Sequence, residues 1–211
     1  MRGSELVEAF EEKGLHVLTI NDIVRMTGGS RAYAWTVAER LIKRNILSRA
    51  ARGVYYTGKA TLLEVASNIV SPSYVSLSSA FSYYGFLQQA LTAADVITPK
   101  RHSDAAFGGA QIHFITLKKE RVFGFCRDNA NIVVAEPEKA FVDALFLRTP
   151  QYGYVDAAFA RAVQSGRIDG KRFLEYARRM GVKALARRAK AMIEENGMGA
   201  ILDRTEKRGK E

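Results

Sequence analysis

Two consecutive glycines, Gly28 and Gly29, separate two helical segments near the start of the chain. The first segment begins at Asn21, a residue type that caps helices, and is expected to run through Met26. Glycine adopts left-handed backbone conformations without steric cost, so the glycine pair permits a sharp turn. Ser30, a second capping residue, follows directly and predicts the start of another helix. The chain is therefore expected to turn tightly between two crossed helices.

The segments on either side of this helix pair extend the pattern. A short helix is predicted over residues 4–13, before the pair. After the pair, residues 46–48 and 54–57 alternate in polarity as two short strands, with Arg49 and Arg52 in the connection between them. Helix, helix, turn, helix and hairpin is the order of a winged helix-turn-helix, in which a helix enters the major groove of DNA and the hairpin reaches the backbone or the minor groove.

The helix that begins at Ser30 is expected to have an apolar side and a polar side. A helical wheel places on the inward side Ala34, Ala38, Leu41 and Asn45, with Trp35 and Ile42 at its margin. We expect Trp35 at the edge of the core rather than stacked on a base. The polar arc, the helix start and the hairpin supply the predicted DNA contacts, which are Ser30, Arg31, Tyr33, Thr36, Arg40, Lys43, Arg44, Arg49 and Arg52. A basic face that is merely hydrated is the alternative.

The positive charge of the chain is concentrated at its two ends. The 211 residues include 32 Lys and Arg and 22 Asp and Glu, which gives a formal net charge of +10. Residues 1–60 carry +4 and residues 151–211 carry +6, whereas the stretch between them is neutral. This balance favours nucleic acid or an acidic surface as a partner, unless the cations are simply hydrated.

Cysteine, histidine and glycine usage argues against several other classes of protein. Cys126 is the single cysteine, so no intrachain disulfide can form, and the three histidines are too far apart to suggest a metal site. No glycine-rich phosphate-binding motif is present, so we expect no cofactor. The longest uncharged stretch, residues 65–94, is interrupted by seven serines, which excludes a membrane span there. We therefore expect a cytoplasmic protein.

The middle of the chain predicts a small, mainly antiparallel sheet. A linking helix is expected over residues 60–69, and Ser76 is expected to cap another helix that stops at Gly85. Pro137 is predicted to open a further helix, with acids in its first turn. The expected strands comprise residues 96–98, 112–117, 122–125 and 132–134.

The last third of the chain predicts three basic helices, over residues 154–164, 171–180 and 183–195. Their outer faces are expected to carry Arg172, Arg179, Arg187, Arg188 and Lys190, either as a contact surface or as a hydrated one. The fold class is thus α+β. We expect a winged helix-turn-helix at residues 1–58, an α+β domain with a mostly helical C-terminal part at residues 59–200, and a charged, disordered tail at residues 201–211.

Three motifs of the first 150 residues resemble those of one known family. They are Gly53-Val54-Tyr55 at the end of the hairpin, Tyr74-Val75-Ser76-Leu77-Ser78-Ser79-Ala80 with Tyr83-Tyr84-Gly85, and Ala135-Glu136-Pro137-Glu138-Lys139-Ala140 with Asp143. In order and spacing they are similar to the AbiEi family, the antitoxins of type IV toxin-antitoxin systems and related regulators. Beyond Leu147 the chain carries no motif of that family.

The resemblance implies a winged helix that represses the promoter of its own operon, where inverted repeats and a homodimer are expected. It also implies a C-terminal domain that counters a nucleotidyltransferase toxin without a stable complex. The alternative is a winged-helix transcriptional regulator whose C-terminal domain senses a ligand or dimerises.

An enzyme is a third interpretation of the middle region. Glu136, Glu138, Lys139 and Asp143 follow a predicted strand, as acids and a lysine do in metal-dependent nucleases. Their spacing fits such a site poorly, and capping of the helix at Pro137 already explains the two glutamates. The serine-rich run lacks the Gly-x-Ser-x-Gly motif of a nucleophile. We therefore expect no catalytic activity.

Overall fold

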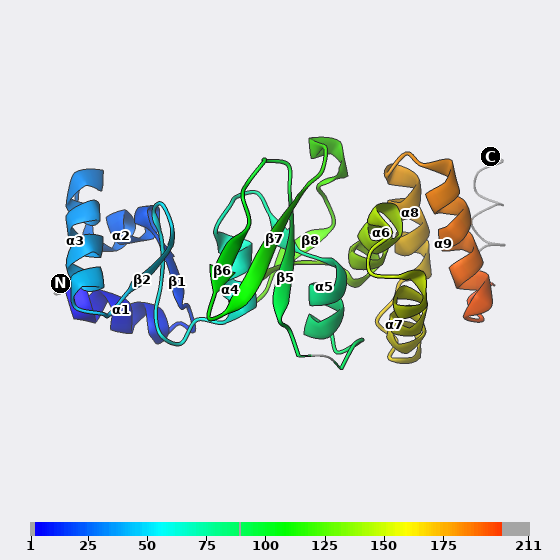
Figure 1. Ribbon diagram of the computed structural model, residues 1–211, viewed down its shortest axis with the longest axis horizontal. Helices are drawn as coiled ribbons and strands as arrows, with labels where there is room; N and C mark the ends of the chain where they lie inside the picture. Colours follow the sequence, from blue (N-terminus) through cyan, green and yellow to red (C-terminus); the bar gives the residue numbers. More distant parts are fainter. Residues whose placement is uncertain (1–2, 89, 200–211) are drawn as a thin grey trace.

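The computed structural model describes residues 3–88 and 90–199, which form an α+β fold extended along one axis (Figure 1). A unit of helices and a small sheet lies at one end, a larger sheet lies in the middle, and helices fill the other end. The predicted tail at residues 201–211 lies outside the described residues. In the described part of the chain, no helix is long and apolar enough to cross a membrane.

The N-terminal unit has its own core. Leu6, Ile23, Leu41 and Tyr55 are among its fully buried side chains. Its three strands pair antiparallel in the order β1-β3-β2. The elements are α1 (Gly3–Glu11), β1 (Val17–Thr19), α2 (Ile20–Thr27), α3 (Arg31–Lys43), β2 (Ser48–Ala51) and β3 (Val54–Tyr56).

The helices and the hairpin of this unit are confirmed, with two corrections. Thr19, not Asn21, caps α2: its hydroxyl accepts the amide of Asp22, and the Asp22 carboxylate accepts the amide of Thr19 at 2.7 Å. This reciprocal pair needs an acid three residues after the cap, which Thr19 has. In addition, residues 17–19, which the sequence analysis did not assign to a strand, form β1 and complete the small sheet.

The central sheet is mixed, and antiparallel pairings are in the majority, as expected. Its order is β6-β7-β5-β4-β9-β8, and three of its five strand pairings are antiparallel. The longest pairing, β5 with β7, is parallel, because β6 runs back at the sheet edge and β7 inserts between β6 and β5. The strands are β4 (Tyr74–Val75), β5 (Ala93–Thr98), β6 (Ala105–Phe107), β7 (Ala110–Thr116), β8 (Phe125–Arg127) and β9 (Val133–Ala135).

The predicted strand over residues 122–125 is wrong. Residues 119–121 form a 3-10 helix, and Gly124 has a left-handed backbone (φ 65°) that interrupts an extended path. The strand therefore begins only at Phe125. Short strands β4 and β6 were not expected either, because each is only two or three residues long.

Among the described residues, six α-helices accompany the central sheet and fill the C-terminal end (Figure 1). The predicted helices over residues 154–164, 171–180 and 183–195 are confirmed as α7 to α9. Phe141 of α6, Phe159 of α7 and Phe173 of α8 form a buried chain of ring contacts at 4.9–5.1 Å. The helices are α4 (Leu62–Asn68), α5 (Leu77–Tyr83), α6 (Pro137–Leu147), α7 (Tyr152–Gln164), α8 (Gly170–Arg179) and α9 (Lys183–Glu195).

Candidate nucleic-acid interface

The start of α3 is fixed by its cap and by the glycine turn before it. The Ser30 hydroxyl accepts the backbone amide of Tyr33 at 3.2 Å, and Gly28 takes the left-handed conformation (φ 64°) as predicted. A Cβ atom at Gly29 would lie only 2.6 Å from Cδ1 of Tyr33. The absence of a side chain at Gly29 therefore allows the Tyr33 ring to lie over the turn, where it is 47% exposed.

The two sides of α3 separate largely as the wheel predicts. Ala34, Ala38 and Leu41 are buried, and so is Val37, which the wheel analysis did not include. Asn45 is exposed, contrary to prediction, because the helix ends at Lys43 and Asn45 turns away with φ 56°. The residues predicted to face outward are all exposed, namely Arg31, Tyr33, Thr36, Arg40, Lys43 and Arg44.

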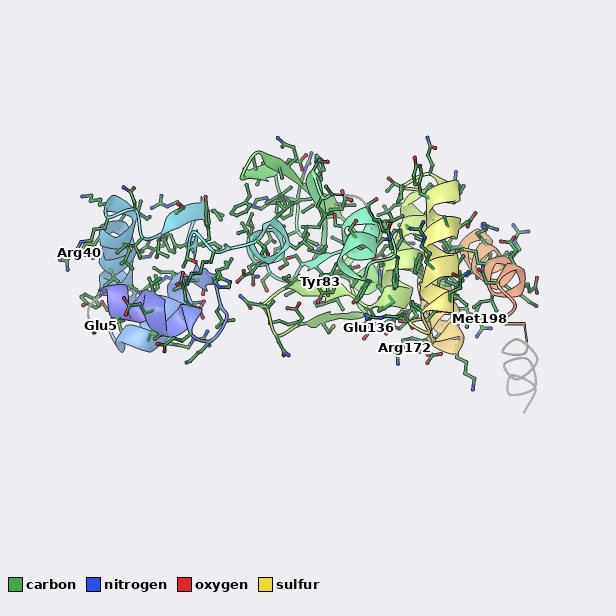
Figure 2. The ribbon with its side chains drawn as sticks, turned by 90° about the horizontal axis from the view of Figure 1, so that it is seen from below. Glu5, Arg40, Tyr83, Glu136, Arg172 and Met198 are labelled. Atoms are coloured by element: carbon green, nitrogen blue, oxygen red, sulfur yellow. The ribbon has the colours of Figure 1, made fainter. Side chains whose placement is uncertain are left out.

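Some outward side chains of α3 form hydrogen bonds within the protein, whereas others form no ion pair with the described part of the chain. Arg31 donates to the Asn21 side chain at 3.3 Å, and the Thr36 hydroxyl donates to the Ala32 carbonyl. Within the described residues, no carboxylate forms an ion pair with Arg40 or Lys43 in the second half of the helix, or with Arg44 at its C-cap. Figure 2 shows Arg40 at the outer end of the molecule, directed away from the rest of the chain. These three cations are the most accessible to an anionic partner.

The two hairpin arginines are not equivalent. Arg49 lies within β2, not at the tip, where it forms an ion pair with Glu39 and has its guanidinium carbon 6.0 Å from the centre of the Tyr55 ring. Arg52 lies in the turn before Gly53 and is exposed. The sequence places both arginines at the tip because it predicts β2 to end at Ser48, three residues too early. Arg52 is therefore the hairpin cation best placed to reach outward.

A groove of about 480 Å³ lies between α3 and the hairpin. Trp35 forms one side, and it is half-buried against Tyr55 in an edge-to-face contact with ring centres 6.4 Å apart. This position fits the expectation that Trp35 lies at the edge of the core. Arg49, Ala50, Ala51 and Arg52 line the rest of the groove.

Two of the three motifs that carry the family resemblance meet in a buried hydrogen-bonded cluster, the Lys139 cluster. The Asp143 carboxylate accepts from Ser76 at 2.9 Å and from Tyr74 at 3.1 Å, and it pairs with the ammonium group of Lys139. The Lys139 ammonium group also donates to the Tyr74 hydroxyl at 2.9 Å. All four side chains are fully buried. The Ser76 hydroxyl does not cap α5, contrary to prediction, because it donates to Asp143 instead.

The electrostatics of this cluster are those of a closed ion pair. Burial lowers the pKa of Lys139 and raises the pKa of Asp143, while the opposite charge of each partner counteracts both shifts. Lys139 also lies 4.8 Å from the centre of the Phe123 ring. Because every member is enclosed by its partners, the Lys139 cluster has no exposed nucleophile, acid or base.

The neighbouring acids are not arranged as a metal site. Glu136 accepts from the Tyr176 hydroxyl at 2.5 Å, and Glu138 accepts from the backbone amide of Asp169 at 2.7 Å. Glu136 occupies the N-cap of α6 and Glu138 its first turn, as predicted, but the Glu136 side chain makes no capping hydrogen bond. Tyr176 of α8 and the amide of Asp169, the N-cap of α8, hold the two carboxylates. No cluster of three or more His, Cys, Asp and Glu side chains suited to a metal occurs in the described ranges.

Cys126, the single cysteine, is exposed on β8. Partial burial and the nearby carboxylates of Glu136 and Asp128 raise the pKa of its thiol. A raised pKa keeps sulfur in the thiol form, which is a poor nucleophile. The surroundings of Cys126 therefore do not resemble those of a catalytic cysteine.

The C-terminal basic residues do not form one open patch. Arg172 lies 3.9 Å from Glu136 (Figure 2), and Arg179 stacks over the Phe123 ring at 3.9 Å. Arg188 bridges Asp156 of α7 and Glu195 of α9, at 2.7 and 3.0 Å. Arg187 and Lys190 are exposed on α9. Three of the five predicted contact residues thus contact acids or rings of their own chain.

No protein-family model matches this sequence, and no curated protein matches it.

Proposed function

We propose that the N-terminal unit is a winged helix-turn-helix that binds double-stranded DNA. The observation that carries this proposal is the accessible cationic side of α3 next to a hairpin with Arg52 at its tip. A helix of 13 residues is about 20 Å long and fits the major groove, which is about 12 Å wide. The glycine turn and the Ser30 cap hold this helix at the far end of the molecule, clear of the central sheet (Figure 1).

We further propose that the chain is a type IV antitoxin that represses its own operon and counters a nucleotidyltransferase toxin. Support comes from two of the three motifs of the AbiEi resemblance, those that contain Tyr74 and Lys139, which lie about 65 residues apart in sequence and meet in the Lys139 cluster. Two motifs that meet in one buried cluster form a shared structural core, which supports the resemblance more than two isolated matches would.

The first test is binding of the full chain to the DNA upstream of its own gene, measured by fluorescence anisotropy against a scrambled duplex of equal length. Specific affinity at least about 1000-fold above the scrambled duplex is expected for an operator. Equal affinity for the two duplexes would leave only non-specific attraction by the cationic ends. Growth rescue of cells that express the adjacent gene then tests the antitoxin activity separately.

The hairpin arginines supply a second prediction. Arg52→Ala should weaken binding and reduce the slope of log affinity against log salt by about 1, because one phosphate contact is lost. Arg49→Ala is the matched control, and it should change this slope less because Arg49 lies within β2 rather than at the tip and already contacts Glu39 and the Tyr55 ring. The measurement is a DNA titration at several salt concentrations. A larger effect from Arg49 than from Arg52 would contradict the assignment.

The C-terminal arginines supply a third prediction. Arg188→Glu should lower the melting temperature, because it places a third acid beside Asp156 and Glu195. Arg187→Glu makes the same charge change at an exposed site of α9 and should not lower it. Thermal melting of both variants checks this difference. If Arg187→Glu melts normally but loses growth rescue, its surface contacts a partner; full rescue would show that this surface is only hydrated.

A further inference from the structure

A polar cleft lies between the N-terminal unit and the central sheet. It consists of two adjoining hollows of about 350 and 390 Å³, which share Thr19, Asn68 and Arg127 in their linings. Asp22 and Arg25 of α2 line the wall formed by the N-terminal unit. The opposite wall consists of the end of α4, the loop after it, and strands β8 and β9. Cavities of this size hold small organic molecules in other proteins.

Arg127 is held in this cleft by neutral groups. Its Nη1 donates to the Asn68 side chain at 2.9 Å and to the Asn131 carbonyl at 3.2 Å, and it also contacts the Asn131 side chain. Within the described ranges, no carboxylate forms an ion pair with this guanidinium. The amide oxygens orient Arg127 but leave its positive charge without a counterion. An oriented guanidinium of this kind is suited to carboxylate or phosphate oxygens.

Arg25, on the facing wall, is a second cation in the cleft, and its own ion pair competes only weakly with a ligand. Arg25 pairs with Asp22, but its side chain is 76% exposed, and ion pairs at such sites contribute little. The capping box occupies the other Asp22 oxygen, which accepts from the amide and the hydroxyl of Thr19. Two arginines against one carboxylate therefore leave the cleft with a net positive charge.

The remaining lining suits an organic anion better than a bare ion. Val70, Pro72, Phe125 and Val133 provide apolar surface in the hollow of about 350 Å³, next to the hydroxyl-bearing Ser71. A molecule with an anionic end and a carbon skeleton would place its oxygens against Arg127 and its skeleton against these side chains. A small inorganic ion would contact Arg127 but not the apolar side chains.

We propose that this cleft binds a small organic oxyanion, with its carboxylate or phosphate oxygens on Arg127. The walls belong to two units that also contact each other through the buried Glu64, which accepts from the His16 amide at 2.7 Å, and through Lys59 and Glu11. A ligand between the walls restrains how the two units are oriented. This site is independent of α3, which lies on the far side of the N-terminal unit (Figure 1).

The test is a titration of the isotope-labelled full chain, without DNA, followed by NMR of its backbone amides. The probes are inorganic phosphate, adenosine 5′-monophosphate and citrate, with sodium chloride as the control for ionic strength. Saturable shifts of the Thr19, Asn68 and Arg127 amides with at least one organic probe are expected. Inorganic phosphate tests whether an ion without a carbon skeleton binds as tightly as an organic anion. Adenosine 5′-monophosphate and citrate distinguish recognition of a phosphate group from recognition of a carboxylate.

Arginine variants then locate the site. Arg127→Ala should weaken binding at least about tenfold, and Arg127→Lys should restore only part of it because lysine lacks the planar fork. Arg178→Ala, an exposed position on α8, removes the same charge elsewhere and should bind like the wild type. Arg25→Ala provides a second variant if Arg127→Ala fails to fold. The proposal is overturned if neither organic probe gives saturable shifts in the cleft, or if the shifts persist in both arginine-to-alanine variants.

Discussion

Asp143→Ala is expected to lower the free energy of unfolding by about 3–5 kcal/mol, because it leaves the ammonium group of Lys139 buried without its counterion. Lys139 and Asp143 are both fully buried, so water cannot replace the lost partner. The variant also removes the acceptor for Ser76 and for Tyr74. Urea denaturation at neutral pH, followed by circular dichroism, measures this difference.

The double variant Lys139→Met, Asp143→Leu is the control for this prediction. Removing both charges together leaves no unpaired ion, so the double variant should be more stable than Asp143→Ala. The two effects are coupled, and their non-additivity measures the interaction between the ion-pair partners. If Asp143→Ala costs less than about 1 kcal/mol, or if the double variant is the least stable protein, the Lys139 cluster does not stabilise the fold in this way.

Local patterns predicted several helix starts and turns well. The glycine turn, the Ser30 cap and the start at Pro137 depend on residues close in sequence, and each occurs where it was expected. The exposed side of α3 was predictable for the same reason, because helical periodicity alone separates its two faces. Boundaries were less accurate, as in β2, where a shift of three residues changed the position of Arg49.

Long-range contacts were not predictable from local patterns. The parallel pairing of β5 with β7 depends on where β6 lies, and the short strand β4 becomes a strand only between β5 and β9. The partners of Glu136 and Glu138 are Tyr176 of α8 and the N-cap of that helix, Asp169, more than 30 residues later in the chain. A proline and two acids at a helix start suggest capping by themselves, and only the fold shows that α8 and its N-cap contact both carboxylates.

The sequence contains a sign of the Lys139 cluster, but residues close in sequence do not reveal its other members. Lys139 and Asp143 are four residues apart on one face of a helix that is otherwise rich in apolar residues. A charged pair within such a run indicates a buried ion pair. Its partners Tyr74 and Ser76, however, lie more than 60 residues earlier in the sequence, with most strands of the central sheet in between. The family resemblance grouped these motifs, and the contacts give a physical reason for the grouping.

The described parts of the two basic ends do not form one surface. The outward cations of α3 lie at one end of the molecule, and α8 and α9 lie at the other, with the central sheet between them (Figure 1). Net charge alone therefore predicts attraction to nucleic acid but not where the contact lies. We expect the specific contact at α3, because Arg40, Lys43 and Arg44 have no acidic partner among the described residues.

Arg40→Ala is expected to lower the affinity for the operator by about 1–3 kcal/mol, or roughly 5- to 150-fold, if its guanidinium reads a base in the major groove. Arg40 is exposed at the outer end of the molecule (Figure 2), so its removal should leave the core of the N-terminal unit intact. Fluorescence anisotropy with the operator and with scrambled DNA measures the change, and thermal melting verifies that the variant is folded.

Two comparisons decide what Arg40 contacts. Arg178→Ala removes the same charge from α8 at the opposite end, and it should leave operator binding nearly unchanged if α3 is the interface. A loss with Arg40→Ala that is larger on the operator than on scrambled DNA identifies a base contact, whereas equal losses identify a phosphate contact. If Arg40→Ala binds both duplexes as the wild type does, α3 does not enter the groove through this residue. The cationic side of α3 would then be only a hydrated surface.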